Sequence, residues 1–216
     1  MRVPVALCLF VLLGSLAACG TDDDRSTEAG GPDLAATLTA NPAVTAERIT
    51  WTYTLRNDEA SPIAVFNGAW GDDPPDAGPV SWVVAGPDDT IEVSQRVFAP
   101  PPGVGLARDY MQYGTVLQPG ETLTGTAMAS RPFRVNHPYE SIFDPPLELP
   151  EDPSKVVLCV GIARAADVPG EPVPTPTATP PTGSSPSPAG PLTYYRHNQS
   201  TVDSEHLVCA PPLELT

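Results

Sequence analysis

One stretch of regular alternation limits the folds that this chain can adopt. Residues 48–56 (RITWTYTLR) alternate between apolar and polar side chains. The apolar ones share one face of an extended strand: Ile49, Trp51, Tyr53 and Leu55. A strand of this kind has one face on a core and one face in water, which is typical of antiparallel sheets. Its aromatic side chains are therefore expected in the core.

The rest of the chain repeats this pattern in short segments separated by turn residues. With 29 prolines and 17 glycines the chain cannot be mainly helical, because both residue types interrupt helices. We expect about nine strands and no amphipathic helix. The expected strands are residues 34–40, 48–56, 63–66, 80–84, 91–97, 113–117, 122–130, 155–165 and 204–210. The sequence thus predicts an all-β fold, specifically an antiparallel immunoglobulin-like β-sandwich.

Three connections predict how neighbouring strands are joined. Residues 41–42 (NP) are expected to turn the chain after its first strand. Residues 57–62 are expected to return it, so that 63–66 pairs with 48–56. Residues 86–89 (GPDD) predict a hairpin with a four-residue connection.

Two long segments do not have the pattern of strands. Residues 131–153 form a proline-punctuated excursion with several aromatic side chains, and long loops of this kind often carry binding function. Residues 168–191 are rich in Pro, Thr and Ser and cannot bury a core. We expect them to be a disordered insertion in a single domain that spans residues 33–216. Either an O-glycosylated stalk or an undecorated loop fits their composition.

The first 18 residues predict an export signal. Arg2 supplies a positive charge, and residues 3–13 are an apolar run. The run is too short to span a bilayer as a helix, which needs about 20 apolar residues. Residues 1–18 are therefore expected to be a signal peptide that is removed.

The signal ends in residues 16–19 (LAAC), which resemble the lipobox of bacterial lipoproteins. The resemblance implies cleavage after Ala18, diacylglycerol on Cys19, and a lipid-anchored position on the extracytoplasmic face of the cell membrane. Two or three acyl chains make such attachment stable. Residues 19–32 are polar and Gly-rich and are expected to form a flexible tether. Lys155 is the only lysine, and the chain is rich in Ala, Pro and Gly, so it looks like a lipoprotein from a high-GC genome such as an actinobacterial one.

Two of the four cysteines lie beyond the lipobox. In an oxidising compartment, Cys159 and Cys209 are expected to form a disulfide, and two buried free thiols are the alternative. If their strands are antiparallel neighbours with the two cysteines opposite each other, Arg164 falls opposite Ser204.

Charge and motif content disfavour several functions. The chain carries 26 acidic and 11 basic side chains, a net charge of −15, so nucleic acid and anionic headgroups are poor partners. It has no nucleophile elbow and no zinc-protease, Walker or dinucleotide-binding pattern. The histidines His137, His197 and His206 are too scattered to define a metal site. We therefore predict a protein that is not an enzyme and that holds no cofactor or metal.

Two loops offer aromatic side chains for binding a partner. Residues 67–79 carry Trp70 and several aspartates, whose spacing matches no EF-hand. The proline-punctuated excursion carries the other candidates, His137, Tyr139 and Phe143.

The strand and turn layout also resembles the immunoglobulin-like domains of bacterial envelope proteins. The likeness rests on residues 52–66 (TYTLRNDEASPIAVF) and 117–121 (LQPGE) and carries no binding residues. The layout is similar as well to the intracellular proteinase inhibitor family, although a lipobox conflicts with an intracellular role.

The first hypothesis is a lipid-anchored interaction or scaffold module of the cell envelope, without catalytic activity. It would bind an envelope protein or ligand, of unknown identity, through the two loops with aromatic side chains. The alternatives are an extracytoplasmic carrier of a ligand or metal and a weak hydrolase.

Overall fold

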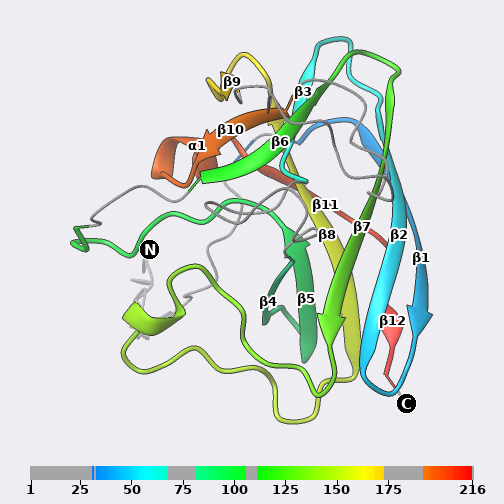
Figure 1. The fold of residues 1–216 in the computed structure, drawn as a ribbon, viewed down its shortest axis with the longest axis vertical. Helices are drawn as coiled ribbons and strands as arrows, with labels where there is room; N and C mark the ends of the chain where they lie inside the picture. The colour runs from blue at the N-terminus through cyan, green and yellow to red at the C-terminus, as the bar shows by residue number, and fades with distance from the viewer. Residues whose placement is uncertain (1–30, 32, 68–80, 106–110, 173–191, 216) are drawn as a thin grey trace, which may run out of the picture.

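The computed structural model describes residues 31, 33–67, 81–105, 111–172 and 192–215. Their strands form two sheets, one of three strands and one of nine (Figure 1). The prediction of an all-β fold is confirmed. No helix in these ranges is both long enough and apolar enough to cross a membrane.

The smaller sheet contains β1 (Ala36–Val44), β2 (Arg48–Asn57) and β7 (Thr122–Ser130), in the order β1-β2-β7 and all antiparallel. β2 is the strand with the strict alternation. Its apolar side chains are buried, with relative exposures of 0 % for Ile49, 3 % for Trp51, 1 % for Tyr53 and 0 % for Leu55. The prediction of a strand with one buried and one open face is confirmed.

The larger sheet is built around β8 (Lys155–Arg164). From one edge its order is β4 (Trp82–Ala85), β5 (Thr90–Gln95), β8, β3 (Ile63–Val65), β6 (Met111–Leu117), β10 (Leu192–Arg196) and β9 (Glu171–Pro172). β5 and β3 pair with successive stretches of one side of β8, at residues 155–160 and 162–164. β11 (His206–Cys209) and β12 (Leu213–Glu214) pair with its opposite side. These ranges contain twelve strands, and β9, β10 and β12 are the ones beyond the expected nine.

The larger sheet is mixed, because β5 and β8 run parallel. The prediction of a purely antiparallel sandwich is wrong for this pair. The chain between them passes through β6, β7 and a long loop, so no hairpin forces the two strands into opposite directions. The hairpin between β4 and β5 does form, with residues 86–89 as its four-residue connection.

The main core lies between the two sheets. The smaller sheet contributes Trp51, Tyr53 and Leu123 among others, and β8 contributes alternate residues such as Leu158 and Val160. Tyr53 also links the sheets by a hydrogen bond, since its hydroxyl donates to Oε1 of Gln95 at 2.6 Å, and Nε2 of Gln95 donates to the carbonyl of Thr126 at 3.0 Å.

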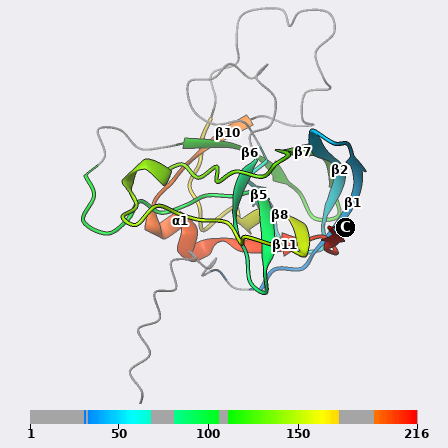
Figure 2. The same ribbon diagram turned by 90° about the horizontal axis from the view of Figure 1, so that it is seen from below.

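The opposite face of the larger sheet, here called the back face, is covered as well. Phe66, Ala163, Tyr195 and Val202 form a second cluster there. Val202 belongs to the short helix α1 (Gln199–Ser204), which lies against this side of the sheet (Figure 2). The large sheet therefore has two buried faces, and the small sheet has one.

The first predicted turn is wrong, because β1 continues through Asn41 and Pro42 to Val44. Pro42 pairs with Trp51 in the ladder, and β1 is an edge strand of its sheet. Proline is tolerated there because an edge strand needs no amide donor on its open side.

The predicted pairing of residues 63–66 with 48–56 is also wrong. Residues 58–62 carry the chain from β2 across to the other sheet, where β3 pairs with β6 and β8. All three residues of β3 are fully buried. A strand with no solvent face fits the middle of a covered sheet rather than a half-exposed hairpin.

The disulfide between Cys159 and Cys209 is present, and its predicted register is confirmed. The two residues are direct partners in the β8–β11 ladder, with Cα atoms 4.0 Å apart. The bond closes a loop with a sequence separation of 50 residues. In the chain-entropy account, such a cross-link stabilises the fold by about 4 kcal/mol.

The predicted pairing of Arg164 with Ser204 is wrong. Arg164 pairs with Ile63, and Ser204 is the last residue of α1. Asn198 caps that helix, its side chain accepting from the amide of Thr201. This capped turn shortens the last predicted strand to β11.

The Pro/Thr-rich segment begins later than predicted. Val168 is 2 % exposed in the back-face cluster, and Glu171 and Pro172 form β9 against β10. A buried valine and a ladder partner are enough to place these residues on the sheet. Residues 173–191 lie outside the described part of the chain.

Candidate functional site

The predicted binding residues of the long excursion lie against the back face, and two of them are buried. His137 is 7 % exposed and Tyr139 is 0 % exposed, while Phe143 is partly buried. Trp70 and Cys19 lie outside the described residues. In this conformation, His137 and Tyr139 hold the loop to the sheet rather than facing a partner.

Backbone hydrogen bonds attach this loop, residues 131–154, to the edge strand β4. The amides of Val83 and Asn136 donate to each other's carbonyls at 2.9 Å, and the side-chain amide of Asn136 donates to the carbonyl of Ser81. The chain then turns through the short 3-10 helix η2 (Glu140–Ile142). The loop thereby covers the edge of the larger sheet.

Below the loop lies a cluster of rings, here called the histidine–aromatic cluster. Its members come from β4, the segment after β5, the loop and the segment before α1: Trp82, Phe98, His137, Tyr139, Phe143 and His197. The rings of Phe98 and His137 have centroids 4.3 Å apart, and those of His137 and Phe143 are 5.3 Å apart. Edge-to-face packing of this kind stabilises each ring pair by about 1 kcal/mol beyond its buried area.

Both histidines in the cluster are held in the neutral form. Nδ1 of His137 accepts from the amide of Tyr139 at 3.1 Å, and Nδ1 of His197 accepts from the amide of Phe98 at 3.3 Å. Burial, with a smaller contribution from Arg96, lowers the pKa of His137 to about 4. Burial, with a contribution from His137, lowers the pKa of His197 to about 3. At neutral pH the cluster therefore contains no imidazolium.

A buried ion pair lies beside the rings. Nη2 of Arg96 is 3.2 Å from Oε2 of Glu205, and Nε of Arg96 donates to the same oxygen at 3.2 Å. The other carboxylate oxygen accepts from the amide of Val97 at 3.0 Å. Arg96 also pairs with Glu92 at 3.6 Å and lies over the Phe98 ring at 4.9 Å. This one guanidinium thus contacts the sheet, the α1–β11 connection and the ring cluster.

The Glu205 carboxyl can reach this position because β8 has a glycine beneath it. A Cβ on Gly161 would clash with Oε1 of Glu205 and would lie 3.1 Å from the Phe66 ring. Burial raises the pKa of Glu205 to about 7, while Arg96 and the Val97 amide act to lower it. Nδ1 of the neighbouring His206 lies 3.5 Å from Oδ1 of Asp33.

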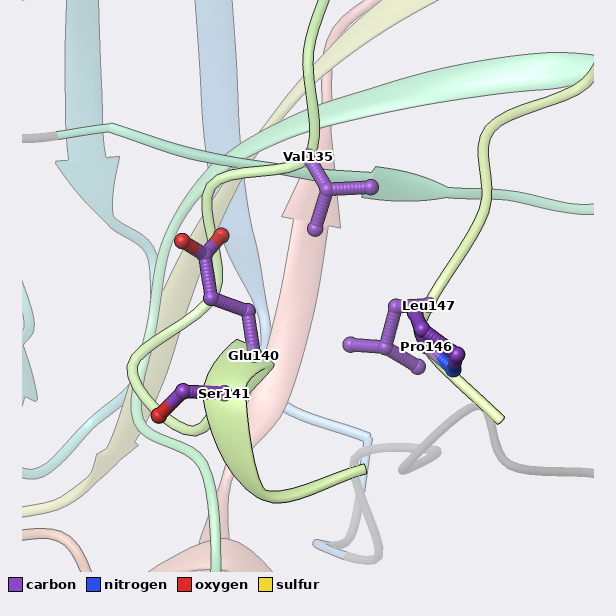
Figure 3. A pocket seen from close by; sticks show the side chains of 5 residues that line it. All are labelled: Val135, Glu140, Ser141, Pro146 and Leu147. Atoms are coloured by element: carbon purple, nitrogen blue, oxygen red, sulfur yellow. The ribbon is translucent and has the colours of Figure 1, made fainter. Parts of the chain in front are cut away.

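A hollow of about 310 Å³ opens on the outer side of the same loop. It is lined by Val135, Glu140, Ser141, Pro146 and Leu147. Figure 3 shows Val135 and Leu147 pointing into the gap between two arms of the loop, with η2 on one side. Val135, Pro146 and Leu147 form the apolar part of its lining and Ser141 and Glu140 the polar part, and Glu140 is the one charged residue among them.

Sequence reasoning missed Arg96, Glu205 and the hollow. Arg96 and Glu205 are 109 positions apart, and nothing in the alternation pattern indicates that two charged residues are buried together. The signal that could have raised the question is Gly161, an isolated glycine in the apolar run of β8, since such a glycine often marks a close approach. Among the described residues, no three His, Cys, Asp or Glu side chains are placed to hold a metal ion.

A scan of protein-family models, a search of curated proteins and a search of solved structures each gave no match to this chain.

We expect Glu205→Ala to lower the free energy of unfolding by about 3–5 kcal/mol at pH 6. The substitution removes the oxygens that accept from the buried Arg96 guanidinium and from the Val97 amide. Urea denaturation measures the change. Glu171→Ala is the matched control, since it removes a pair at 2.7 Å to Arg196 whose side chains are 59 % and 49 % exposed. That control should change stability by less than about 1 kcal/mol. Equal effects of the two substitutions would contradict this account of the buried pair.

We also expect the free energy of unfolding to rise between pH 5 and pH 6. In this window the unfolded chain binds protons on His137 and His197 that the native state does not bind, because burial lowers both pKa values. Glu205 acts in the opposite sense, since its raised pKa keeps a proton on the native state that the unfolded chain releases. The net difference is one proton, or roughly 1.4 kcal/mol per pH unit.

The double variant His137→Asn/His197→Asn tests the sign of this dependence. Asparagine keeps an oxygen near the position of Nδ1, so the two amides retain an acceptor. With only Glu205 left, stability should fall as the pH rises through the same window. Urea midpoints at pH 5 and pH 6 give both slopes, and equal slopes for the two proteins would show that the histidines do not titrate as described.

Proposed function

We propose that this chain is a lipid-anchored lipoprotein of the cell envelope whose folded part is a non-catalytic interaction module. Residues 16–19 (LAAC), following a short apolar run, support anchoring at Cys19. The Cys159–Cys209 disulfide supports an oxidising location, because such bonds persist outside the reducing cytoplasm. The immunoglobulin-like kind of sandwich remains part of this proposal. It is supported by an antiparallel three-stranded sheet packed on a larger sheet.

The observation that carries the interaction role is the hollow in residues 131–154. The loop that forms it is long and irregular, yet buried Tyr139 and His137 fix it to the sheet. A binding surface on a loop that a rigid scaffold holds in place loses little conformational entropy when a partner binds. This combination supports a recognition site more than an unstructured connection.

Size and charge indicate the kind of group that the hollow would take. About 310 Å³ is at the small end of ligand sites, so it suits one or two side chains of a partner rather than a large cofactor. Val135, Pro146 and Leu147 offer contacts to an aliphatic stem, and Glu140 offers a carboxylate to its end. A lysine or arginine side chain of an envelope protein has both features.

The anchor is tested by Cys19→Ala in the full-length chain. Loss of the acyl acceptor should leave the domain folded but shift it from the membrane fraction to the soluble fraction, or stop maturation before cleavage. Fractionation with mass spectrometry of the N-terminus gives the result. A processed Cys19→Ala protein that stays in the membrane fraction would rule the lipid anchor out.

The hollow is tested by Leu147→Asp in the same full-length chain, with crosslinking mass spectrometry on native membranes. A carboxylate in an apolar wall should reduce crosslinks to the partner by at least about tenfold, because it would be desolvated on binding. Glu148→Asp is the control, since Glu148 neighbours Leu147 on the loop but does not line the hollow. Unchanged crosslinks with Leu147→Asp would place the binding surface elsewhere.

A further inference from the structure

The outer face of the three-stranded sheet presents a grid of threonines, here called the threonine face. The strand register aligns the outward residues in rows across the sheet. Two complete rows are Thr39, Thr54 and Thr124, and Asn41, Thr52 and Thr126. The threonines of the face are Thr37, Thr39, Thr50, Thr52, Thr54, Thr122, Thr124 and Thr126. All are exposed except Thr50, which is partly buried.

The face has no carboxylate at any outward strand position, although the chain has a net charge of −15. Its only charged members are Arg48 and Arg56, near the two ends of the middle strand. Exposed positions of the other sheet are, in contrast, often charged, as at Arg164, Glu171 and Glu214. The high strand propensity of threonine explains its presence on an open face, but it does not explain why no strand position of the face is acidic. The carboxylate of Asp58, which follows the middle strand, reaches one end of the face and pairs with Arg56 at 3.3 Å.

Most of these hydroxyls are available to a ligand. In the part of the chain that the structure describes, the hydroxyl of Thr37 donates to Asp58 at 2.7 Å, and no other threonine of the face has a side-chain hydrogen bond. Threonine also has a single side-chain torsion that its branched Cβ already restricts, so little entropy is lost when a ligand orders it. The face is therefore a rigid array of donors and acceptors, each beside a methyl group.

The shape of the face limits what can bind. Its three strands are about 4.8 Å apart and its strands rise about 3.4 Å per residue, so the face is roughly 10 Å wide and 27 Å long. A small molecule needs a concave site, which a sheet face of this kind does not provide. Protein–protein interfaces are usually anchored by aromatic side chains from one or both partners, and the outward positions of this face include no aromatic residue.

We propose that the threonine face binds an extended, uncharged polysaccharide chain. Such a chain is linear, carries repeated hydroxyls and aliphatic ring hydrogens, and has no charge for the acidic protein to repel or attract. Weak hydrogen bonds from single sugars would add along the length of the strands. This surface is separate from the hollow, since β1, β2 and β7 lie on one side of the molecule and the loop of residues 131–154, which forms the hollow, lies on another (Figures 1 and 2).

The test is co-sedimentation of the full-length protein, in detergent, with insoluble cellulose and insoluble chitin. The triple variant Thr52→Val/Thr124→Val/Thr126→Val keeps side-chain shape and strand propensity but removes three hydroxyls. We expect the native chain to sediment with at least one of these polysaccharides, and the triple variant to bind it at least about tenfold more weakly. Ser200→Ala, an exposed hydroxyl on α1, is the control and should bind like the native chain.

Two results would overturn the proposal: no sedimentation of the native chain with either polysaccharide, or equal sedimentation of the triple variant. Analytical ultracentrifugation gives a third such result: if the native chain is a dimer and the triple variant a monomer, the face binds a second copy of the chain, and the polysaccharide proposal is wrong. Leu147→Asp should bind polysaccharide normally, so failure of the hollow and failure of the threonine face are separate results. Circular dichroism melting confirms that every variant is folded.

Discussion

The buried Arg96–Glu205 ion pair links the segment after β5 to the connection between α1 and β11, two segments that also pack together through Val97 and Val202. Arg96 follows β5 and Glu205 follows α1, and their side chains are 4 % and 0 % exposed. Removing two charges from water costs several kcal/mol per ion, so the pair is tolerated only because hydrogen bonds surround it. The Val97 amide supplies one, and the indole of Trp82 donates to the Arg96 carbonyl at 3.0 Å. The connection from α1 to β11 is thereby fixed on the back face of the larger sheet.

The ring cluster and the loop depend on that arrangement. Phe98 lies under the Arg96 guanidinium and between the two histidines, whose imidazoles accept from backbone amides. Burial is the main cause that lowers the pKa of both histidines and keeps them neutral, and the Arg96 guanidinium adds to this effect at His137. Tyr139 and His137 in turn hold the loop whose outer side forms the hollow. The hollow that we propose as a recognition site thus depends on buried interactions beneath the loop.

Sequence patterns predicted what depends on local periodicity. The alternation of β2 follows from a spacing of two residues and the β4–β5 hairpin from a short turn, and the structure has both. The pairing of Cys159 with Cys209, which the structure also has, was expected because they are the two cysteines beyond the lipobox. The crossing of β3 to the other sheet could not be predicted, because a short apolar run is equally compatible with either sheet. Arg96 and Glu205 were missed for a related reason. Charged residues are expected in water unless a partner is known, and this partner is 109 positions away.

The two surfaces to which we assign binding also differ in how far the sequence predicts them. The hollow depends on long-range contacts, so only the structure could show that Val135 and Leu147 face each other across a loop (Figure 3). The threonine face depends on strand alternation and register, so its middle strand could be predicted from the sequence as the outward residues of β2. The rows formed by Thr39, Thr54 and Thr124 arise only when the β1–β2 and β2–β7 registers are combined. β1, β2 and β7 lie on one side of the molecule and the loop of residues 131–154 on another (Figures 1 and 2), so the two proposed surfaces would allow one chain to hold two partners at once.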